Sequence, residues 1–424
     1  MLFMQNLKIL LIFICLTCFS LKASIKFATN GVTFRLQPAA TLNLSQTMTI
    51  SSGTFFKFED SIVAGENMVF DYSYWNDPDE SMLFSGVYDP SVDGITLSGD
   101  KFINGIIGEL AETVTVSGVN NIIEGLLSFA NPIYIQDSST TVTFSMQTPL
   151  NQSIYLNGGT IYLGSNLEFT FGNGIGGYGI INGNGNTIAL AGSVEFTSTL
   201  ELNDLAEFRL GGNSTISGDL TFNGNTTLNY NGNSVTFLPT GVVKMGSNSI
   251  ITVKNGAFEN VHGTNVSCFA GASLVLNNIK TTFDGDFTFT SGSLLIQDNV
   301  AFVGPHIFAY QSEETSTIDS GGNLLLDRYF TFSYDPITDN RDLIKMTDNT
   351  SILSMDGATL HSTPTGMRLI TGRLKVLSES LIEAEGSNET EAISLGDDNP
   401  ANNLTIVSQA DLDISGWVDF KGVD

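Results

Sequence analysis

A glycine-rich stretch in the middle of the chain has the spacing of a nucleotide-binding loop. Gly172, Gly174 and Gly177 form a G-x-G-x-x-G pattern, and the acidic residue Glu195 follows about 20 residues later. In a dinucleotide-binding domain such glycines bring the backbone close to a pyrophosphate, a helix N-terminus faces it, and the acid binds the ribose. The residues after Gly177 are instead β-branched residues and further Gly-Asn pairs, which do not favour a helix. We therefore interpret residues 171–186 as a glycine-rich corner between repeated units, and Glu195 as an outward-facing residue of a strand.

Other residue types that serve in catalysis are scattered along the chain. The histidines, His262, His306 and His361, are isolated in the sequence, so we interpret each of them as structural or incidental. Cys268 lies beside Val and Phe residues, which predicts a small buried side chain rather than a nucleophile. We find no zinc-binding spacing, no serine-nucleophile elbow and no Walker loop.

The charge and the first residues indicate where the chain acts. With 44 Asp and Glu against 17 Lys and Arg, the net charge is −27, which repels phosphate backbones and excludes nucleic acid as a partner. Residues 1–23 combine a short basic start, an apolar run and Ala23 at a plausible cleavage point, which predicts a signal peptide. Cys15 and Cys18 leave with this segment, so Cys268 remains alone and no internal disulfide forms. We expect a secreted or surface-associated protein with no transmembrane segment after signal removal.

The composition favours strands and tight turns, because Gly, Asn, Ser, Thr and aromatic residues are abundant and only 14% of residues are charged. A short repeat period is typical of a solenoid, in which each unit buries its apolar face against its neighbours. Three short alternating strands per period predict an all-β parallel β-helix with about 21 residues per coil, with Asn and Gly at corners that need positive φ and stacked Asn side chains along them. The strand-like tetrads that define the period are EFTF at 168, TIAL at 187, EFRL at 207, TLNY at 227, IITV at 250, SLVL at 273 and SLLI at 293.

Two corner sequences resemble those of known repeats. Residues Gly158–Ile161 read GGTI and Phe222–Asn225 read FNGN, similar to the GGA[ILV] and FxxN repeats of chlamydial polymorphic outer-membrane proteins. With the period, they make residues 110–300 resemble right-handed, single-stranded parallel β-helices of the pectin-lyase-like superfamily, especially the passenger regions of bacterial adhesins and autotransporters. This resemblance implies a surface protein that binds extracellular molecules.

The same superfamily contains enzymes that cut acidic polysaccharides, so the resemblance also implies an enzyme as the alternative. Its hydrolases carry N-T-D, D-D, G-H-G and R-I-K motifs in that order and need two carboxylate positions. The nearest sequences here, VHG at 261–263, RDLIK at 341–345 and GDD at 396–398, stand in another order. Its lyases use calcium-binding acids and a basic residue that abstracts a proton. We see no acidic cluster beside the available arginines, which are Arg35, Arg209, Arg328, Arg341, Arg368 and Arg373.

Two acidic runs and two tryptophans are weaker candidates for binding. The runs at 89–93 and 335–342 lack the regular ligand spacing of a calcium hand, so we assign no metal, cofactor or catalytic residue and keep calcium as the one cofactor left open. Trp75 and Trp417 are candidates for stacking on a sugar ring.

We expect residues 24–424 to form a single β-helical solenoid. Strand-like sequences resume after each of four polar segments, which we interpret as loop insertions near 71–82, 309–322, 333–342 and 394–403.

The function that these observations favour is noncatalytic adhesion or binding of an extracellular glycan or of a molecule on a host or neighbouring cell. A polysaccharide lyase or glycoside hydrolase and a structural envelope or matrix protein are the alternatives. Four acidic or basic side chains that converge in one groove would favour the enzyme.

Overall fold

A computed structural model describes residues 114–119, 121–125, 128–129, 131–399 and 402–422, and the backbone of short strands between Lys26 and Asn104. The expected signal peptide, the segment at 71–82 with Trp75, and the acidic run at 89–93 lie outside the described residues.

The protein is an all-β parallel β-solenoid, as the sequence predicted. Strands make up 58% of the chain, and each turn takes about 22 residues, close to the expected 21. Short strands joined by Gly- and Asn-rich turns build each coil, and the same strand position pairs in parallel from one coil to the next. In the part that the structure describes, no helix is long and apolar enough to cross a bilayer.

Contacts divide the chain into two compact units, residues 1–161 and 162–424. In the first unit the described pairs are parallel, for example β10 with β12 and β11 with β13. Its strands are β1 (Lys26–Phe27), β2 (Val32–Leu36), β3 (Thr41–Leu44), β4 (Thr49–Ile50), β5 (Thr54–Phe58), β6 (Ile62–Gly65), β7 (Met68–Asp71), β8 (Ile95–Ser98), β9 (Lys101–Asn104), β10 (Val114–Ser117), β11 (Asn121–Gly125), β12 (Ile133–Ile135), β13 (Thr141–Met146) and the start of β14 (Ile154–Leu163).

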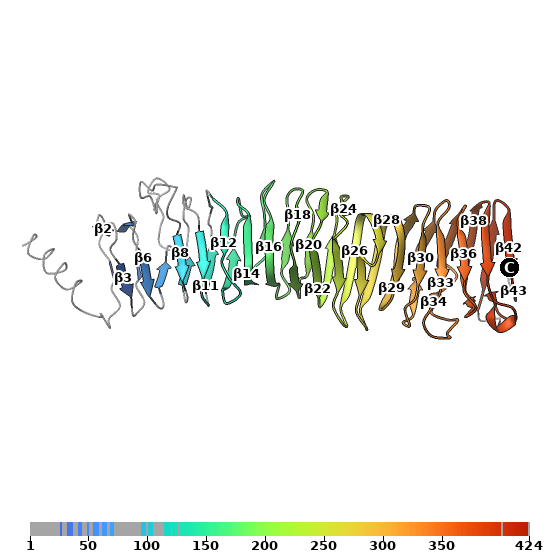
Figure 1. The fold of residues 1–424 in the computed structure, drawn as a ribbon. Coiled ribbons are helices and arrows are strands. Elements are labelled where there is room, and N and C mark those ends of the chain that lie inside the picture. Colours follow the sequence, from blue (N-terminus) through green and yellow to red (C-terminus); the bar gives the residue numbers. More distant parts are fainter. Residues whose placement is uncertain are drawn as a thin grey trace, which may run out of the picture. The chain divides into compact units, whose positions relative to one another are not determined.

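The second unit carries the sites discussed below, and Figure 1 shows its coils following one another in sequence order, from green to red. Its elements are β15 (Leu167–Glu168), β16 (Ile175–Asn182), β17 (Thr187–Ala189), β18 (Glu195–Phe196), β19 (Leu200–Asn203), β20 (Glu207–Arg209), β21 (Ser214–Ile216), β22 (Asp219–Asn223), β23 (Asn225–Asn229), β24 (Ser234–Phe237), β25 (Val242–Met245), β26 (Ile250–Gly263), β27 (Val266–Cys268), β28 (Ser273–Phe289), β29 (Ser293–Val303), β30 (Ile307–Tyr310), β31 (Ser316–Ile318), β32 (Asn323–Leu326), β33 (Thr331–Tyr334), β34 (Ile344–Met346), β35 (Ile352–Asp356), β36 (Thr359–Ser362), β37 (Met367–Leu369), β38 (Gly372–Ser378), β39 (Ser380–Ala384), the 3₁₀ turn η1 (Glu389–Glu391), β40 (Ile393–Leu395), β41 (Leu404–Ser408), β42 (Leu412–Gly416) and β43 (Val418–Phe420).

The strands that carry the tetrads of the sequence pair in parallel from coil to coil in the second unit. One buried apolar residue in each tetrad, or directly before it in the case of Leu167, pairs with its equivalent on the next coil. This column of buried residues confirms the predicted repeat. Successive side chains along a strand point to opposite faces, so residues one coil apart that pair in register share the inward face. The column consists of Leu167, Ile188, Phe208, Leu228, Val253, Leu276 and Ile296.

Asparagine occupies corners of the second unit as expected. Several corner asparagines adopt positive φ, including Asn184 at 50° and Asn278 at 54°. Along another row, the Asn203 amide donates to Asn182 Oδ1 over 3.0 Å and the Asn223 amide donates to Asn203 Oδ1 over 2.8 Å. The predicted stacking of Asn side chains between coils is therefore confirmed.

The expectation that residues 171–186 form only a corner was wrong. Gly172 and Gly177 have φ near +81°, but residues Ile175–Asn182 form strand β16 rather than a corner. Its last four residues pair with β19, and this pairing fixes an extended backbone that glycine tolerates. No helix follows, so the glycines lack the helix N-terminus that a pyrophosphate needs. Glu195 is exposed on β18, as expected.

The segments expected as insertions near the C-terminus differ from one another. Residues 309–322 contain strand β31, which pairs with β29 and β34. Residues 333–342 begin in β33 and continue into a loop that precedes β34, and residues 394–403 begin in β40 and lead to β41.

Candidate functional site

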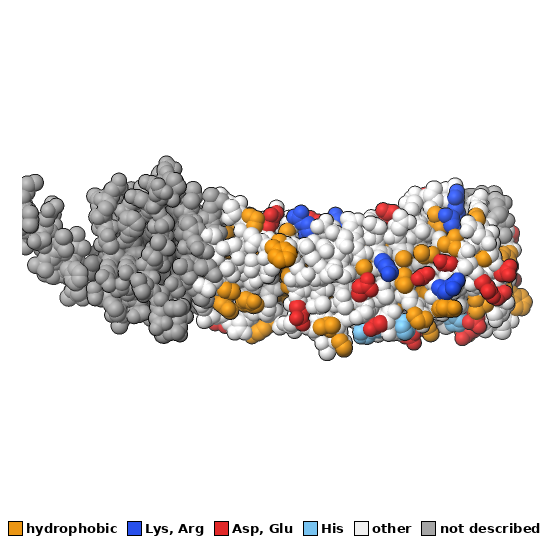
Figure 2. Space-filling model, turned by 90° about the horizontal axis from the view of Figure 1, so that it is seen from above, with side chains coloured by type: hydrophobic (Ala, Val, Ile, Leu, Met, Phe, Trp, Pro, Cys, Tyr) orange, Lys and Arg blue, Asp and Glu red, His pale blue; other side chains and the backbone are white. Residues whose placement is uncertain are grey.

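Charged side chains of the second unit gather towards its C-terminal part (Figure 2). Residues 291–422 contain 20 Asp and Glu against seven Lys and Arg, whereas residues 162–290 contain nine and four. The first half of this unit is thus poorer in charge, and the ionisable groups that could do chemistry lie mostly in its second half.

A pocket of about 750 Å³ lies where the loop after β33 meets the turns after β36, β39 and η1. Four carboxylates and a guanidinium line this pocket. Such a convergence of ionisable groups would favour an enzyme, and the spacing of these residues in the sequence did not reveal it. The lining residues are Asp335, Asp339, Arg341, Thr363, Pro364, Thr365, Glu385, Thr390 and Glu391.

Two of the four carboxylates of this pocket, those of Asp335 and Glu391, accept hydrogen bonds from neighbouring protein groups. Asp335 Oδ2 accepts from the Gln311 amide over 2.8 Å. Glu391 accepts from Ser387 N over 2.7 Å and from Ser387 Oγ over 3.0 Å, and the backbone bond is the main cause of its lowered pKa. A general acid in sugar cleavage needs a raised pKa. Glu391 therefore stays ionised at neutral pH and is unsuited to that role.

A serine, a histidine and a glutamate line up beside the pocket on three successive coils. Ser333 Oγ lies 2.9 Å from His361 Nδ1, and His361 Nε2 lies 3.3 Å from Glu385 Oε1. A nucleophilic serine must reach its substrate, but Ser333 is only 8% exposed, whereas the Glu385 side chain is 54% exposed. We interpret this chain of contacts as a polar ladder that orients Glu385, not as a nucleophile with its base.

Every histidine has a carboxylate partner on a neighbouring coil. The nitrogen–oxygen distances are 2.9 Å, 3.9 Å and 3.3 Å for His262–Asp284, His306–Asp286 and His361–Glu385. The histidines that were isolated in the sequence are thus paired in space, and the spacing of about one coil between partners is the signal that could have found them.

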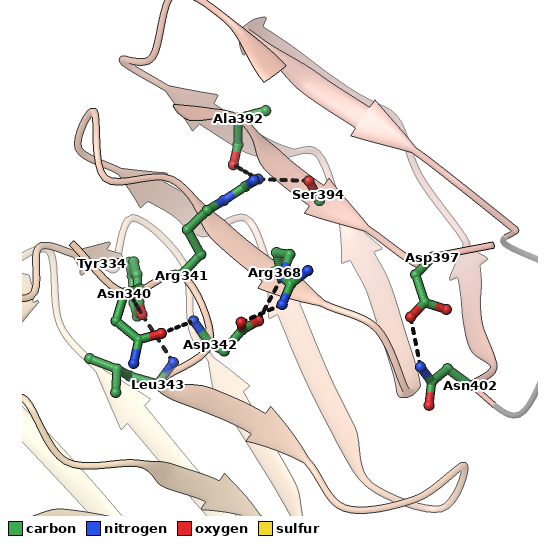
Figure 3. Close-up of polar contacts among 10 residues, drawn as sticks. All are labelled: Tyr334, Asn340, Arg341, Asp342, Leu343, Arg368, Ala392, Ser394, Asp397 and Asn402. Carbon is green, nitrogen blue, oxygen red and sulfur yellow. Dashed lines mark hydrogen bonds and ion pairs between the residues drawn. The ribbon is translucent and has the colours of Figure 1, made fainter. Parts of the chain in front are cut away.

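Two arginines fasten the loop before β34 to the following coils (Figure 3). Arg341 Nη2 donates to Ala392 O and to Ser394 Oγ, each over 2.7 Å. Burial, followed by the nearby Arg368, lowers the pKa of Arg341. Arg368 forms a two-pronged ion pair with Asp342, and its Nε donates to Asp342 Oδ1 over 2.7 Å.

Both guanidinium groups are therefore committed to holding the chain, which argues against either of them as the proton abstractor of a lyase. The acidic run at 335–342 is divided in the same way, because Asp335 and Asp339 face the pocket while Asp342 turns to Arg368. Among the described residues, no group of three or more His, Cys, Asp or Glu is placed to hold a metal ion.

A second recess, here called the amide groove, crosses five successive coils of the second unit and has a volume of about 460 Å³. Asn side chains stand along it, with small and aliphatic residues between them and no carboxylate among its lining residues. The lining residues are Gly232, Asn255, Gly256, Asn278, Ile279, Lys280, Asn299, Val300, Ala301, Asn323 and Leu325.

The groove follows from the corner sequence of each coil. Asn255 and Asn278 have φ of 59° and 54°, so the chain bends sharply there and the strand beyond it turns away. Beyond the bend, Lys280 pairs with Ala301 on the next coil, and Ala301 pairs with Leu325 on the one after. The outward column therefore contains small and aliphatic side chains beside a row of amides.

Cys268 is buried, as the sequence predicted. Burial, followed by the charge of Glu314, raises the pKa of its thiol to about 12, which keeps it protonated and unreactive. Trp417 is 48% exposed on the last coil and lines neither recess.

Comparisons with known proteins found no matching family model, no similar curated protein and no similar solved structure.

Proposed function

We propose that the protein is an exported, noncatalytic recognition protein that binds an extracellular glycan or a molecule on a cell surface. The observation that carries this proposal is the amide groove, which is open, crosses five coils and is lined mainly by amides and aliphatic groups, with Lys280 as its single ionisable side chain. Such a lining offers hydrogen bonds and contact area, and it contains no carboxylate or imidazole to act as a general acid or base.

The repeat supports the same conclusion. Stacked coils display equivalent side chains at regular intervals, which suits recognition of an extended partner. The GGTI and FNGN sequences resemble repeats of adhesin and autotransporter passenger regions, whose function is surface binding, although GGTI lies inside strand β14 rather than at a corner. A signal peptide at residues 1–23 would bring the chain to that location. A structural role in an envelope or matrix is the neighbouring alternative.

A polysaccharide lyase or hydrolase is the second candidate function, and the acidic pocket is the observation that favours it. We rank it below recognition because Glu391 has a lowered pKa and both nearby arginines are held by protein groups.

Fractionation of cells with an antibody, followed by binding of the purified chain to intact cells, envelopes and a glycan array, tests the proposal. We expect the chain outside the cytoplasm and bound to at least one of these surfaces, with no release of reducing or unsaturated sugar ends. A cytoplasmic chain, or sugar ends released from bound polysaccharide, would overturn it.

A further inference from the structure

We propose that the amide groove binds a neutral, linear glycan that lies along the direction in which the coils stack. This inference rests on the proposed recognition function and assigns its site and ligand class. A groove across five coils spans about 19 Å at the usual strand spacing of ~4.8 Å, which is enough for several sugar units.

The pairing of the strands argues against a peptide strand as the occupant. An added strand needs a free sheet edge with unpaired N–H and C=O groups. At the groove β28 pairs with β26 and β29, and β29 also pairs with β32. The backbone groups of the inner strands are therefore already used, and a ligand must be recognised through side chains.

The row of asparagines provides groups that match hydroxyls. A carboxamide carries two donors and an acceptor oxygen with two lone pairs, so it can both give and receive hydrogen bonds. The contacts seen use part of this capacity: Asn278 Nδ2 donates to Asn255 Oδ1 over 3.3 Å, and Asn299 Nδ2 donates to Asp298 Oδ1 over 2.9 Å. Asn255, Asn278 and Asn299 are all exposed, so their remaining amide atoms can bind sugar hydroxyls.

The surfaces between the amides fit the C–H faces of sugar rings. Ala301 and Leu325 are half-buried in the outward column, and Val300 is buried beneath them. Burying such carbon surface against the carbon faces of a sugar removes both from water, which favours binding.

Charge selects a neutral glycan over an acidic one. Lys280 is the single ionisable side chain of the groove, while the chain as a whole carries a net charge of −27. An acidic polysaccharide would be repelled by the net negative charge of the protein and would gain only one favourable charge contact, with Lys280. A neutral glycan is not repelled. Nucleic acid is disfavoured for the same reason.

Two groove variants and a matched control test the site. Ala301→Trp places an indole in the groove, and Ala309→Trp places the same group on another strand, β30. Both alanines are half-buried, outward-facing strand residues, and Ala309 does not line the groove. Asn299→Ala removes one amide at a residue without positive φ. Circular dichroism verifies the fold of each variant.

The readout is binding of the full chain to an array of neutral linear glycans, then titration of the best neutral hexasaccharide, with hexagalacturonate and an unstructured polar peptide as competitors. We expect Ala301→Trp to weaken binding at least about tenfold and Asn299→Ala about fivefold, since each lost contact is a modest one, while Ala309→Trp stays within about twofold of the unmodified chain. We also expect the hexasaccharide to bind more tightly than the disaccharide.

Each opposite result overturns the inference. If Ala301→Trp misfolds, the glycan binding of Asn299→Ala alone tests the site. Binding to cells that neither groove variant changes would leave the recognition function standing and remove this site. Absence of binding to any neutral glycan, or tighter binding of hexagalacturonate or the peptide, would remove the proposed ligand class.

Discussion

Arg341 and Arg368 hold the same loop, yet we expect their removal to destabilise it by different amounts of free energy. Arg341 donates to the carbonyl of Ala392, which is fully buried, and to the hydroxyl of Ser394, which is 6% exposed. Hydrogen bonds to a charged group contribute roughly 1.5–3 kcal/mol, and a buried carbonyl that loses its donor adds a desolvation cost. The Nε of Arg341 is buried without a partner, which offsets part of this gain, so we expect Arg341→Leu to cost about 2–3 kcal/mol.

The ion pair of Arg368 is more exposed and weaker. Its side chain is 44% exposed and that of Asp342 is 36% exposed. Water and salt screen such a pair, so we expect Arg368→Leu to cost about 0.5–1 kcal/mol.

Hydrogen exchange of the backbone amides in β40 and in the loop before β34 measures the local opening free energy, and it does not require the whole solenoid to unfold in one step. Equal losses for the two variants, or a larger loss for Arg368→Leu, would refute the reasoning that burial decides the strength of these contacts.

Further predictions concern Gly366, Phe308 and Cys268 of the second unit. At Gly366 φ is +73° and an added Cβ would lie 2.7 Å from Ala392 O, whereas at Gly321 φ is +74° and the space is open. Gly366→Ala should therefore lower the melting temperature clearly more than Gly321→Ala, which costs only the left-handed strain of about 1 kcal/mol. Phe308 is 3% exposed among other aromatic rings, so Phe308→Ala should cost about 3–5 kcal/mol in urea unfolding, against less than about 1 kcal/mol for the half-exposed Phe269→Ala. The folded state keeps the Cys268 thiol protonated up to a pKa of about 12, so this residue should resist iodoacetamide at pH 8 until the protein unfolds. Its contribution to stability should also fall as the pH rises from about 9 towards 12, because the unfolded thiol ionises first; a Cys268→Ala variant with the same pH dependence would contradict this.

The fold could be predicted because each coil repeats the same physical pattern. Each residue of the core column from Leu167 to Ile296 has a polar residue on at least one side in the sequence, and the members of the column recur at intervals close to one coil. The interpretation of the glycine-rich stretch as a corner was wrong because glycine accepts both turns and extended backbone. Composition alone could not show that Ile175–Asn182 forms a strand whose last four residues pair with β19.

The sites were harder to predict because they are formed between coils. His361 and Glu385 are 24 residues apart and meet only when the phase of each coil is known. The same holds for Arg341 and Ser394, which are separated in the sequence by six strands, β34 to β39. A period estimated to within one or two residues gives the fold, but a side-chain contact requires the exact register, since a shift of one residue turns a side chain to the other face.

A crystal structure of the chain soaked with the best-binding neutral hexasaccharide is the most direct test of glycan recognition by the amide groove, because it shows which of the two recesses is used. We expect an intact sugar chain along the amide groove, with hydroxyls near the amides of Asn278 and Asn299 and ring faces against Ala301 and Leu325. Sugar in the acidic pocket beside Glu385, or a cleaved sugar anywhere on the surface, would contradict it.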